Sequence, residues 1–299
     1  MRYRENIAVL HVAKYLDGYD RMCDHNCIFC MERMEPGDSI ESLPTLSEMK
    51  LALLQYIDHY GEITKLYIAG GEPTLRQDFA EIVKMAQGFC DNIVLSTCCD
   101  YRNTHQTVRE ICKLGIVHVA TSIHGSTSEI HDKLTGINGS FINTLETIKL
   151  LSNNGVRVAV NSVMCSLNIA DMPKISCLFE KRKIPIEKLT FTHYFHHGNA
   201  YYHDELKFNI DDYATVLSES LNKFGDLSYE ITYRDFPLCL DKRLVEHQEI
   251  VEDINIICLN TDGMIAIEEK SPSLQKEKCH SCIMEKDCPK YLMANYTEE

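Results

Sequence analysis

The chain has 299 residues, of which 44% are hydrophobic and 25% charged, and its formal net charge is −14. This length allows one large domain, or one large and one small domain. The acidic balance leaves no basic excess to neutralise phosphates, which argues against non-specific binding to nucleic acid or membranes. We find no signal peptide and no run of about 18 apolar residues, so we expect a cytoplasmic protein without a transmembrane helix.

Cysteine is the unusual feature of the composition, with 14 residues. Three cysteines lie near the start of the chain, five lie near its end, and the other six are scattered. Because thiols stay reduced in the cytoplasm, clustered cysteines there indicate a metal site or catalysis rather than a disulfide framework.

Short apolar runs alternate with longer amphipathic stretches up to about residue 224. Thr45 and Glu48 form the pattern of a capping box at the start of one helix, and Gly155 is the glycine expected just beyond the end of another. In chain order, the sequence predicts strands at 7–12, 64–69, 92–97, 116–123, 156–164 and 187–193, and helices at 45–60, 75–88, 103–114, 140–154, 171–182 and 210–224.

These elements make six β/α units at a spacing of roughly 30 residues, which predicts a parallel sheet with helices outside it. Six units are fewer than the eight of a closed (β/α)8 barrel, so we expect an α/β fold that forms a partial (β/α)6 barrel. A doubly wound sheet has the same pattern and stays an alternative. In both architectures, ligand sites belong at the carboxyl ends of the strands.

The pattern changes after residue 226. Residues 228–233 predict a strand, and residues 254–258 and 263–268 predict a hairpin. A cysteine-rich tail follows. We therefore predict a core domain at 1–225 and a small C-terminal cysteine-rich domain at 226–299.

Cys23, Cys27 and Cys30 form a C-x3-C-x2-C motif in the loop after the first strand, on the expected ligand-binding face. A structural zinc site and a closed iron–sulfur cluster each need four protein ligands. Three thiolates on a [4Fe–4S] cluster leave one iron open to an external chelate. For this motif taken alone, a zinc site remains the alternative.

The motif resembles the signature of the radical S-adenosylmethionine (SAM) superfamily, in which an aromatic residue such as Phe29 precedes the last cysteine. The segment Gly70–Pro73 (GGEP), at the end of the second strand, resembles the family segment that binds the amino group of SAM. Gly70 and Gly71 would let backbone carbonyls approach a cationic amine closely. Glu72 would add a charged acceptor.

Softer matches follow in the order expected for the family. Segment 121–141 resembles the family's fourth-strand segment, where Ser122 and Lys133 would contact the polar groups of SAM. Asn161 lies where family members often contact the ribose or the methionyl carboxylate, and segment 196–200 resembles the G-x-A segment after the sixth strand. For Ser122, Lys133 and Asn161, ordinary polar residues at strand ends are the alternative. The resemblance covers about residues 5–200.

The resemblance implies a radical chemistry. The three thiolates would hold a [4Fe–4S] cluster, SAM would chelate its open iron, and an external donor such as flavodoxin or ferredoxin would supply the electron. Cleavage of SAM would give a 5′-deoxyadenosyl radical that abstracts a hydrogen atom from the substrate. The protein would position these groups and exclude solvent.

Five cysteines near the end of the chain resemble the SPASM and twitch extensions of the same superfamily, which hold auxiliary [4Fe–4S] clusters. Their spacing matches the shorter, one-cluster twitch pattern, and the set needed for two four-cysteine clusters is incomplete. We expect one auxiliary cluster and one spare cysteine, with a structural zinc ribbon as the alternative. The five are Cys239, Cys258, Cys279, Cys282 and Cys288.

Cys98 and Cys99 follow the third strand on the expected active face. A thiol there could return a hydrogen atom to a substrate radical, as epimerisation requires; an incidental small residue is the alternative. The histidines and tyrosines of segment 191–205 would either contact substrate or form a solvated polar loop. The remaining cysteines are expected in core packing.

We predict a radical SAM oxidoreductase that modifies a ribosomally made peptide by crosslinking or epimerisation. Only 22 residues precede Cys23, so recognition of a leader peptide would need a separate protein or the barrel itself. One alternative is dehydrogenation or rearrangement of a small metabolite such as a sugar or an aminocyclitol, which the single-cluster pattern favours. The other is a non-catalytic metal-binding module, which the GGEP segment argues against. We expect no nucleic-acid or membrane partner.

Overall fold

The computed structural model describes most of the chain up to residue 249 and isolated pieces after it. The described residues are 6–13, 22–31, 43–195, 198–208, 210–222, 227–249, 254–259, 265–267, 273–274, 288 and 291–292. Beyond residue 250 only the side chains of Ile257 and Cys288 are described. No helix in these ranges is long and apolar enough to cross a membrane.

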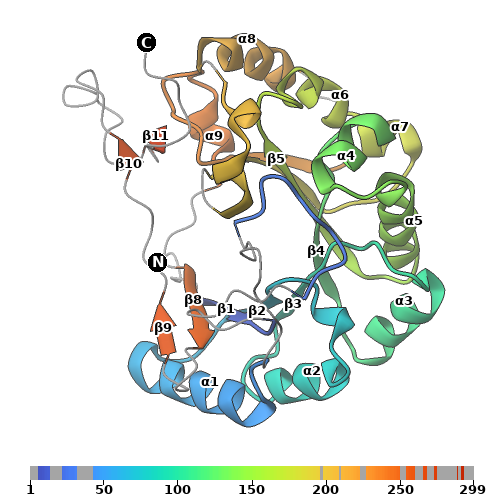
Figure 1. Ribbon diagram of the computed structural model, residues 1–299, viewed down its shortest axis with the longest axis vertical. Helices are drawn as coiled ribbons and strands as arrows, with labels where there is room; N and C mark the ends of the chain where they lie inside the picture. Colours follow the sequence, from blue (N-terminus) through green and yellow to red (C-terminus); the bar gives the residue numbers. More distant parts are fainter. Residues whose placement is uncertain are drawn as a thin grey trace.

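A nine-stranded sheet forms the centre of the described structure. Strands β1 to β7 follow one another in order and run parallel, β8 pairs parallel with the other side of β1, and β9 pairs antiparallel with β8. Within the described ranges no pairing joins β7 to β9, so the sheet curves into an open, partial barrel (Figure 1). The strands are β1 (Ile7–His11), β2 (Lys65–Ala69), β3 (Ile93–Ser96), β4 (His118–Ser122), β5 (Arg157–Met164), β6 (Lys188–His193), β7 (Glu230–Arg234), β8 (Ile254–Leu259) and β9 (Ile265–Ile267), with a separate pair β10 (Ser273–Leu274) and β11 (Tyr291–Leu292).

Helices surround the outer face of this sheet and leave its inner face to the middle of the molecule (Figure 1). They are α1 (Leu46–Tyr60), α2 (Phe79–Gln87), α3 (Thr104–Lys113), α4 (Ser128–Thr135), α5 (Ser140–Asn153), α6 (Met172–Ile175), α7 (Leu178–Arg182), α8 (Ile210–Leu221) and α9 (Leu244–His247), with short 3-10 helices η1 (Pro73–Leu75), η2 (Ile169–Asp171), η3 (Gly198–Tyr202) and η4 (Asp204–Leu206). The α/β partial barrel predicted from the six β/α units is confirmed.

The capping box at the start of α1 is also confirmed. The Thr45 hydroxyl accepts a hydrogen bond from Glu48 N at 3.3 Å, and the Glu48 carboxylate accepts one from Thr45 N at 2.7 Å. These two bonds satisfy backbone donors that would otherwise lack a partner at the first turn. Helix α1 therefore begins where the sequence predicts.

Two helical segments differ from the prediction. Helix α4 was not predicted, and the single helix expected at 171–182 is divided into η2, α6 and α7. At the break, Cys177 N donates to Lys174 O, three residues back, and the Ser176 hydroxyl donates to Met172 O at 2.9 Å. Such short-range bonds compete with the regular helical ladder, which explains the interruption.

The strands that follow residue 226 extend the core sheet. β7 pairs with β6 at one edge, and β8 pairs with β1 at the other. The predicted hairpin is present as β8 and β9, but these strands belong to the core sheet rather than to a separate C-terminal layer. The reason is that the edges of an open sheet present unpaired backbone groups, which β7 and β8 satisfy. The domain boundary at residue 226 stays a prediction.

Successive residues of a strand point alternately toward the outer helices and toward the inside of the barrel. On β6, Leu189 and Phe191 are fully buried under the outer helices, whereas Lys188 and Thr190 face the inner cavity. The apolar core therefore lies between sheet and helices, and the inside of the barrel is left for a site.

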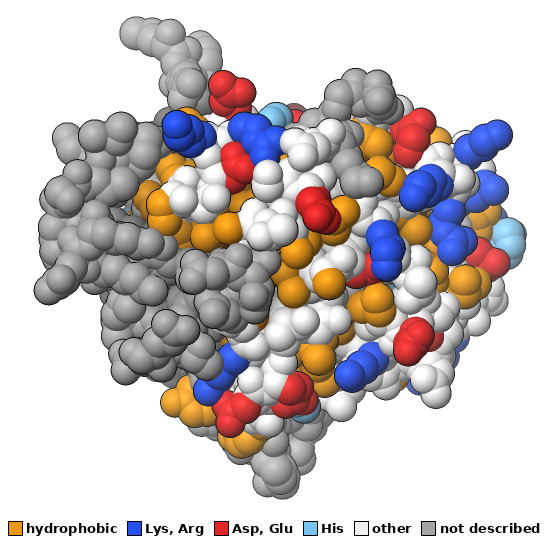
Figure 2. Space-filling view, turned by 90° about the horizontal axis from the view of Figure 1, so that it is seen from above, with side chains coloured by type: hydrophobic (Ala, Val, Ile, Leu, Met, Phe, Trp, Pro, Cys, Tyr) orange, Lys and Arg blue, Asp and Glu red, His pale blue; other side chains and the backbone are white. Residues whose placement is uncertain are grey.

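On the face of the molecule seen in Figure 2, basic and acidic side chains lie interspersed.

Candidate active site

A cavity of about 520 Å³ opens inside the barrel. It is lined by the loop after β1, by the carboxyl ends of β2 to β5 and by the inner faces of β6 and β7. The structure brings together, in this one cavity, nine of the predicted site residues: Cys23, Cys27, Phe29, Cys30, Gly70, Gly71, Cys98, Ser122 and Asn161. Glu72, Pro73, Cys99 and Lys133 do not line it.

The loop that carries the three cysteines is locked onto the turn after β2. Met22 O accepts a hydrogen bond from Glu72 N at 2.6 Å. Gly71 has a φ of +56°, and a Cβ atom there would collide with the same Met22 carbonyl. Only glycine allows this approach, because it lacks a side chain and adopts positive φ without strain. The two sequence motifs are thus parts of one structure.

A second contact to the cysteine loop comes from the turn after β6. Asn199 N donates to Cys30 O at 2.7 Å, and the Asn199 amide donates to Cys27 O at 2.8 Å. Gly198, with a φ of +59°, lies against the carbonyls of Met31 and Cys30 where a Cβ atom has no room. The segment that resembles the family's G-x-A segment therefore positions the cysteine motif.

The C-terminal end of α4 supplies a third contact. Asn26 N and Ile28 N donate to Thr135 O and Leu134 O at 2.9 and 3.0 Å. The His25 side chain pairs with Asp100 at 3.0 Å. The hydrogen bond from His25 holds the pKa of Asp100 below its usual value. The loop is therefore fixed by α4 and by the loop after β3 as well.

The Glu72 carboxylate does not line the cavity and is 2% exposed. One oxygen accepts from the backbone and hydroxyl of Thr74 at 3.1 and 2.6 Å. The other accepts from the Thr97 hydroxyl and from Cys98 N, both at 2.7 Å. Pro73 begins η1 directly after Glu72 and is buried. Glu72 therefore ties the end of β2 to the end of β3, and its contact with an amine ligand stays a prediction.

The cysteine side chains fit a three-thiolate cluster site. Cys23, Cys27 and Cys30 are all partly exposed, none forms a disulfide, and all line the same cavity. Across the described ranges, no three His, Cys, Asp or Glu side chains are placed to hold one metal ion together. A [4Fe–4S] cluster has a different requirement, because its cysteine thiolates bond to the irons of a larger cluster. The donor set and its setting suit that cluster.

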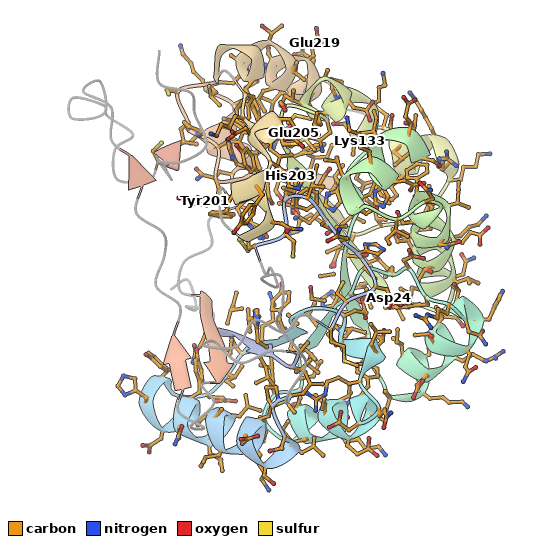
Figure 3. The ribbon with its side chains drawn as sticks, in the orientation of Figure 1. Asp24, Lys133, Tyr201, His203, Glu205 and Glu219 are labelled. Atoms are coloured by element: carbon orange, nitrogen blue, oxygen red, sulfur yellow. The ribbon has the colours of Figure 1, made fainter. Side chains whose placement is uncertain are left out.

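Ser122 and Asn161 are neighbours on β4 and β5 and line the cavity together. The Asn161 side-chain oxygen accepts from the Thr192 hydroxyl at 2.6 Å, which turns its NH2 group away from that partner. Both residues are placed to meet a polar ligand. Lys133, in contrast, is exposed on α4. It lies on the same side of the partial barrel as Glu205 of η4 (Figure 3). Its contact with SAM stays a prediction.

His124 lies beside the cysteine loop and was not singled out from the sequence. It is 3% exposed, lines the cavity, and packs edge-on against Phe29 with ring centroids 4.5 Å apart. Its Nδ1 accepts from Val163 N at 3.1 Å, so a neutral His124 carries its proton on Nε2. Burial holds the pKa of His124 well below its usual value. His124 is therefore a neutral hydrogen-bond donor.

Cys98 and Cys99 have different surroundings although they are adjacent. Cys98 lines the cavity, whereas Cys99 is fully buried with a φ of +57°. Burial, reinforced by the neighbouring Glu72 charge, raises the pKa of Cys98 well above its usual value. Burial also raises the pKa of Cys99 to about 12. Both side chains are therefore thiols at neutral pH, and of these two only Cys98 lines the cavity.

Segment 191–205 divides between the core and the surface. His193 and Tyr194 are buried, and Tyr201 and Tyr202 are exposed. His196 and His197 lie outside the described residues. A ring contact between His193 and Phe208, at 4.8 Å, belongs to an aromatic cluster outside the barrel. The buried part of this segment thus packs the outer core.

A charged group on the far wall of the cavity was missed by sequence reasoning. Lys188 and Thr190 on β6, Arg234 on β7 and Glu249 beyond α9 all line the cavity. A signal was available on β6, because a strand buried in a parallel sheet normally carries apolar residues on both faces. Polar residues at alternate positions indicate a face that lines a cavity. No local signal identifies Glu249, which arrives from a loop.

The segments that carry two of the five C-terminal cysteines, Cys239 and Cys288, meet in the described structure. Cys288 Sγ accepts a hydrogen bond from Leu238 N, the residue before Cys239, at 3.4 Å. Cys239 is exposed and Cys288 partly buried. The side chains of Cys258, Cys279 and Cys282 lie outside the described residues.

A comparison with known families and curated proteins gives clear matches. The family model described as the Radical SAM superfamily matches residues 21–175, slightly more than half of the chain. Fe-coproporphyrin III synthase of Methanosarcina barkeri is 28% identical over 184 residues, 60% of this chain and 43% of that protein. PqqA peptide cyclase of Bradyrhizobium diazoefficiens is 28% identical over 155 residues, 51% of this chain and 39% of that protein. The chain spans less than half the length of these relatives.

Solved structures share the fold. SuiB of Streptococcus suis, solved with bound S-adenosylmethionine, superposes with a TM-score of 0.64 over 94% of this chain and 71% of that chain. The two sequences are 14% identical. At this identity the likeness establishes the architecture of the barrel.

Proposed function

Because the chain belongs to the radical SAM superfamily, we propose that its cavity binds a [4Fe–4S] cluster and SAM and that the enzyme uses them to modify a peptide. When bound, and given one electron by an external reductant, the cluster and SAM would supply the chemistry of hydrogen-atom abstraction from the substrate. The observation that carries the proposal is the close contact between Met22 and Gly71. It holds the cysteine motif and the glycine turn after β2 at one cavity.

The roles of the cavity residues follow from their positions. Cys23, Cys27 and Cys30 would hold three irons of the cluster. The glycine turn at residues 70–71 would present backbone carbonyls to the SAM amine, since Glu72 is already occupied by protein donors. Ser122 and Asn161 would bind the polar groups of SAM, and the apolar inner residues would exclude water from the radical.

A peptide substrate is supported by one relative's name and by one solved complex. A relative at 28% identity is a PqqA peptide cyclase. SuiB, which shares the fold, has also been solved with its precursor peptide SuiA bound. The modification of the peptide would be either a crosslink or an epimerised residue.

The second candidate is a small substrate processed by the same radical chemistry. A relative at 28% identity is an Fe-coproporphyrin III synthase, which is named for a small molecule. The predicted single auxiliary cluster also favours this candidate.

We further propose one auxiliary [4Fe–4S] cluster held by four of the five C-terminal cysteines. The contact between Cys288 Sγ and Leu238 N supports this, since it brings two of these cysteine segments together. Its role would be to take an electron from a substrate radical or to position the substrate, and an external reductant such as flavodoxin or ferredoxin would serve the first cluster.

The test is anaerobic reconstitution with iron and sulfide, followed by incubation with SAM and dithionite. The wild-type chain should release 5′-deoxyadenosine, and Cys27→Ala should release none. Cys112→Ala, on the outer helix α3, is the matched control and should retain the reaction. Wild-type protein that binds zinc tightly, takes up no iron and releases no 5′-deoxyadenosine would overturn the proposal.

The substrate class needs its own test. If a neighbouring gene encodes a short peptide, that peptide would be incubated with the reconstituted enzyme in D2O and examined by mass spectrometry. Loss of two hydrogens indicates a crosslink, and gain of one deuterium indicates epimerisation. Epimerisation would require a hydrogen donor, for which Cys98 is the candidate, so Cys98→Ala should abolish deuterium gain. If the peptide stayed unchanged while a small metabolite was processed, the result would favour the small-substrate candidate.

A further inference from the structure

The part of the cavity wall formed by β6, β7 and the segment after α9 carries a compact group of charges. Lys188 Nζ donates to the Glu249 carboxylate at 2.5 Å, and Arg234 Nη2 donates to its other oxygen at 2.8 Å. The Thr190 hydroxyl donates to that second oxygen at 3.2 Å. The three charged side chains are between 21% and 34% exposed. We call Lys188, Arg234 and Glu249 the charged wall.

The charged wall carries a surplus of one positive charge. Burial raises the pKa of Glu249, but the charges of Arg234 and Lys188 outweigh it and lower that pKa below its usual value. Glu249 is therefore ionised and neutralises one of two cations. Among the described residues that line the cavity, no other Lys, Arg, Asp or Glu is present. Apart from the cysteine thiolates proposed to bind the cluster, the described lining thus offers this surplus no counter-charge.

The charged wall also has donors left over. Within the described part of the chain Arg234 uses only Nη2, and its Nε is buried without a hydrogen-bond partner. Lys188 uses one contact of the three its ammonium group can make. Arg234 Nη1 also donates no hydrogen bond to the described residues, so the edge formed by Nη1 and Nη2 is left for the planar geometry of a carboxylate.

We propose that the charged wall binds a carboxylate of the substrate and so orients the substrate toward the cysteine loop. A single surplus charge matches a carboxylate monoanion better than a phosphate, which carries about −1.5 to −2 at neutral pH. The inference rests on the proposed function, because it assigns the cavity to a substrate. The carboxylate can belong to a peptide or to a small acid.

Two pairs of probes distinguish these sources. The peptide Ac-Gly-Glu-Gly-NH2 carries one side-chain carboxylate, and Ac-Gly-Gln-Gly-NH2 is its neutral partner. Glucuronate carries one carboxylate on a small molecule, and glucuronamide is its neutral partner. Binding to the full, anaerobically reconstituted chain with SAM present would be measured by equilibrium dialysis. At least one carboxylate should bind more tightly than its amide, and the tighter acid identifies the source.

Charge variants then test the charged wall itself. Arg234→Gln should weaken binding of the carboxylate probe by about tenfold and leave the amide probe unaffected. Glu249→Gln should tighten carboxylate binding several-fold, because it raises the surplus from one positive charge to two. Arg157→Gln, which removes an exposed arginine that pairs with Glu187 on the protein surface, is the matched control and should leave binding unchanged.

The two variants should change carboxylate affinity in opposite directions, and this difference distinguishes ligand recognition from a purely structural ion pair. If Glu249→Gln weakened carboxylate binding as Arg234→Gln does, or if acids and amides bound equally, the proposal would be overturned. It would also be overturned if Arg234→Gln weakened SAM binding as much as probe binding, since the wall would then serve SAM. These measurements need no turnover. Protein that binds the acids yet releases no 5′-deoxyadenosine would refute the proposed function and the role of the acid as its substrate, and would leave only a carboxylate-binding site.

Discussion

The carbonyl oxygen of Met22 occupies the space beside Gly71 that a Cβ atom would need. Gly71→Ala should therefore push away the start of the cysteine loop, and the positive φ adds about 1–2 kcal/mol of backbone strain. We expect the reconstituted variant to retain less than about half of the wild-type iron of the first cluster while its helical content is unchanged. Iron and sulfide analysis together with circular dichroism would measure this.

Gly61→Ala is the matched control for that substitution. Gly61 has a φ of +84°, but no atom lies within 4 Å of the position that a Cβ atom would take there. With a ψ of −168°, Gly61 lies in a region that other residues rarely adopt, so the control adds backbone strain without displacing the loop. Equal iron content in Gly71→Ala and Gly61→Ala would contradict the claim that the turn after β2 positions the cysteines.

Glu72→Gln should destabilise the fold even though the side chain keeps its size. The carboxylate accepts four hydrogen bonds, and an amide NH2 would face donors at one of its two ends. We expect a loss of about 3 kcal/mol in the free energy of unfolding, measured by urea denaturation of the full chain. Glu62→Gln, an exposed residue before β2, should change stability by less than about 0.5 kcal/mol. A Glu72→Gln variant as stable as wild type would show that these bonds contribute nothing net.

Acid should destabilise the fold through buried histidines. Burial lowers the pKa of His193 to about 4, below the value of about 6.5 in an unfolded chain. Between these two values the unfolded state binds a proton that the folded state excludes, so stability falls as the pH is lowered from about 6.5 to about 4. The full effect for one such group is about 3 kcal/mol. His131, whose pKa burial also lowers to about 4, adds to it.

His193→Phe should flatten this pH dependence by removing one of the buried histidines whose pKa is lowered, a set that also includes His131 and His124. Phenylalanine suits the site, because His193 packs against Phe208, Tyr213 and Phe236. Denaturation would be followed at several pH values, with His105→Gln, an exposed position on α3, as the control that keeps the wild-type slope. An unchanged slope in His193→Phe would mean that this group does not drive the acid response.

The C-terminal cysteines should account for a separate share of the iron. If the proposed auxiliary cluster is present, wild-type protein holds about eight irons per chain, and a variant that loses this cluster holds about four. Cys239→Ala and Cys288→Ala identify which cysteines take part, and Cys177→Ala, beside α7, is the control expected to keep about eight. Full iron content in both variants would exclude both residues as ligands.

Much of the barrel could be predicted because its periodicity is local. Alternating apolar runs and amphipathic stretches identified the strands β1 to β6, and the Thr45 capping box identified the start of α1. The pairing of β8 with β1 could not be predicted in this way, because it joins segments far apart in the chain through backbone groups that carry no sequence signature. Helix α4 was missed because its eight residues are too few for a clear period.

The site divides along the same line. The spacing of Cys23, Cys27 and Cys30 and the glycines after β2 pointed to one cavity, and the structure places both motifs there. The charged wall was missed because Glu249 meets Lys188 and Arg234 only when the segment after α9 packs against β6 and β7. Local sequence patterns indicate which face of a helix or strand is polar or apolar, but they do not indicate which faces pack together in the fold.

The pairing of β1 with β8 has a consequence for biosynthesis. β1 leads directly into the cysteine loop, and its partner on one side lies more than 240 residues later in the chain. During synthesis β1, which precedes the cysteine loop, therefore waits until β8 has been made before its last backbone hydrogen bonds form. Insertion of a cluster into the nascent chain would precede completion of the sheet, and the loop would then depend on its glycine turns to keep its shape.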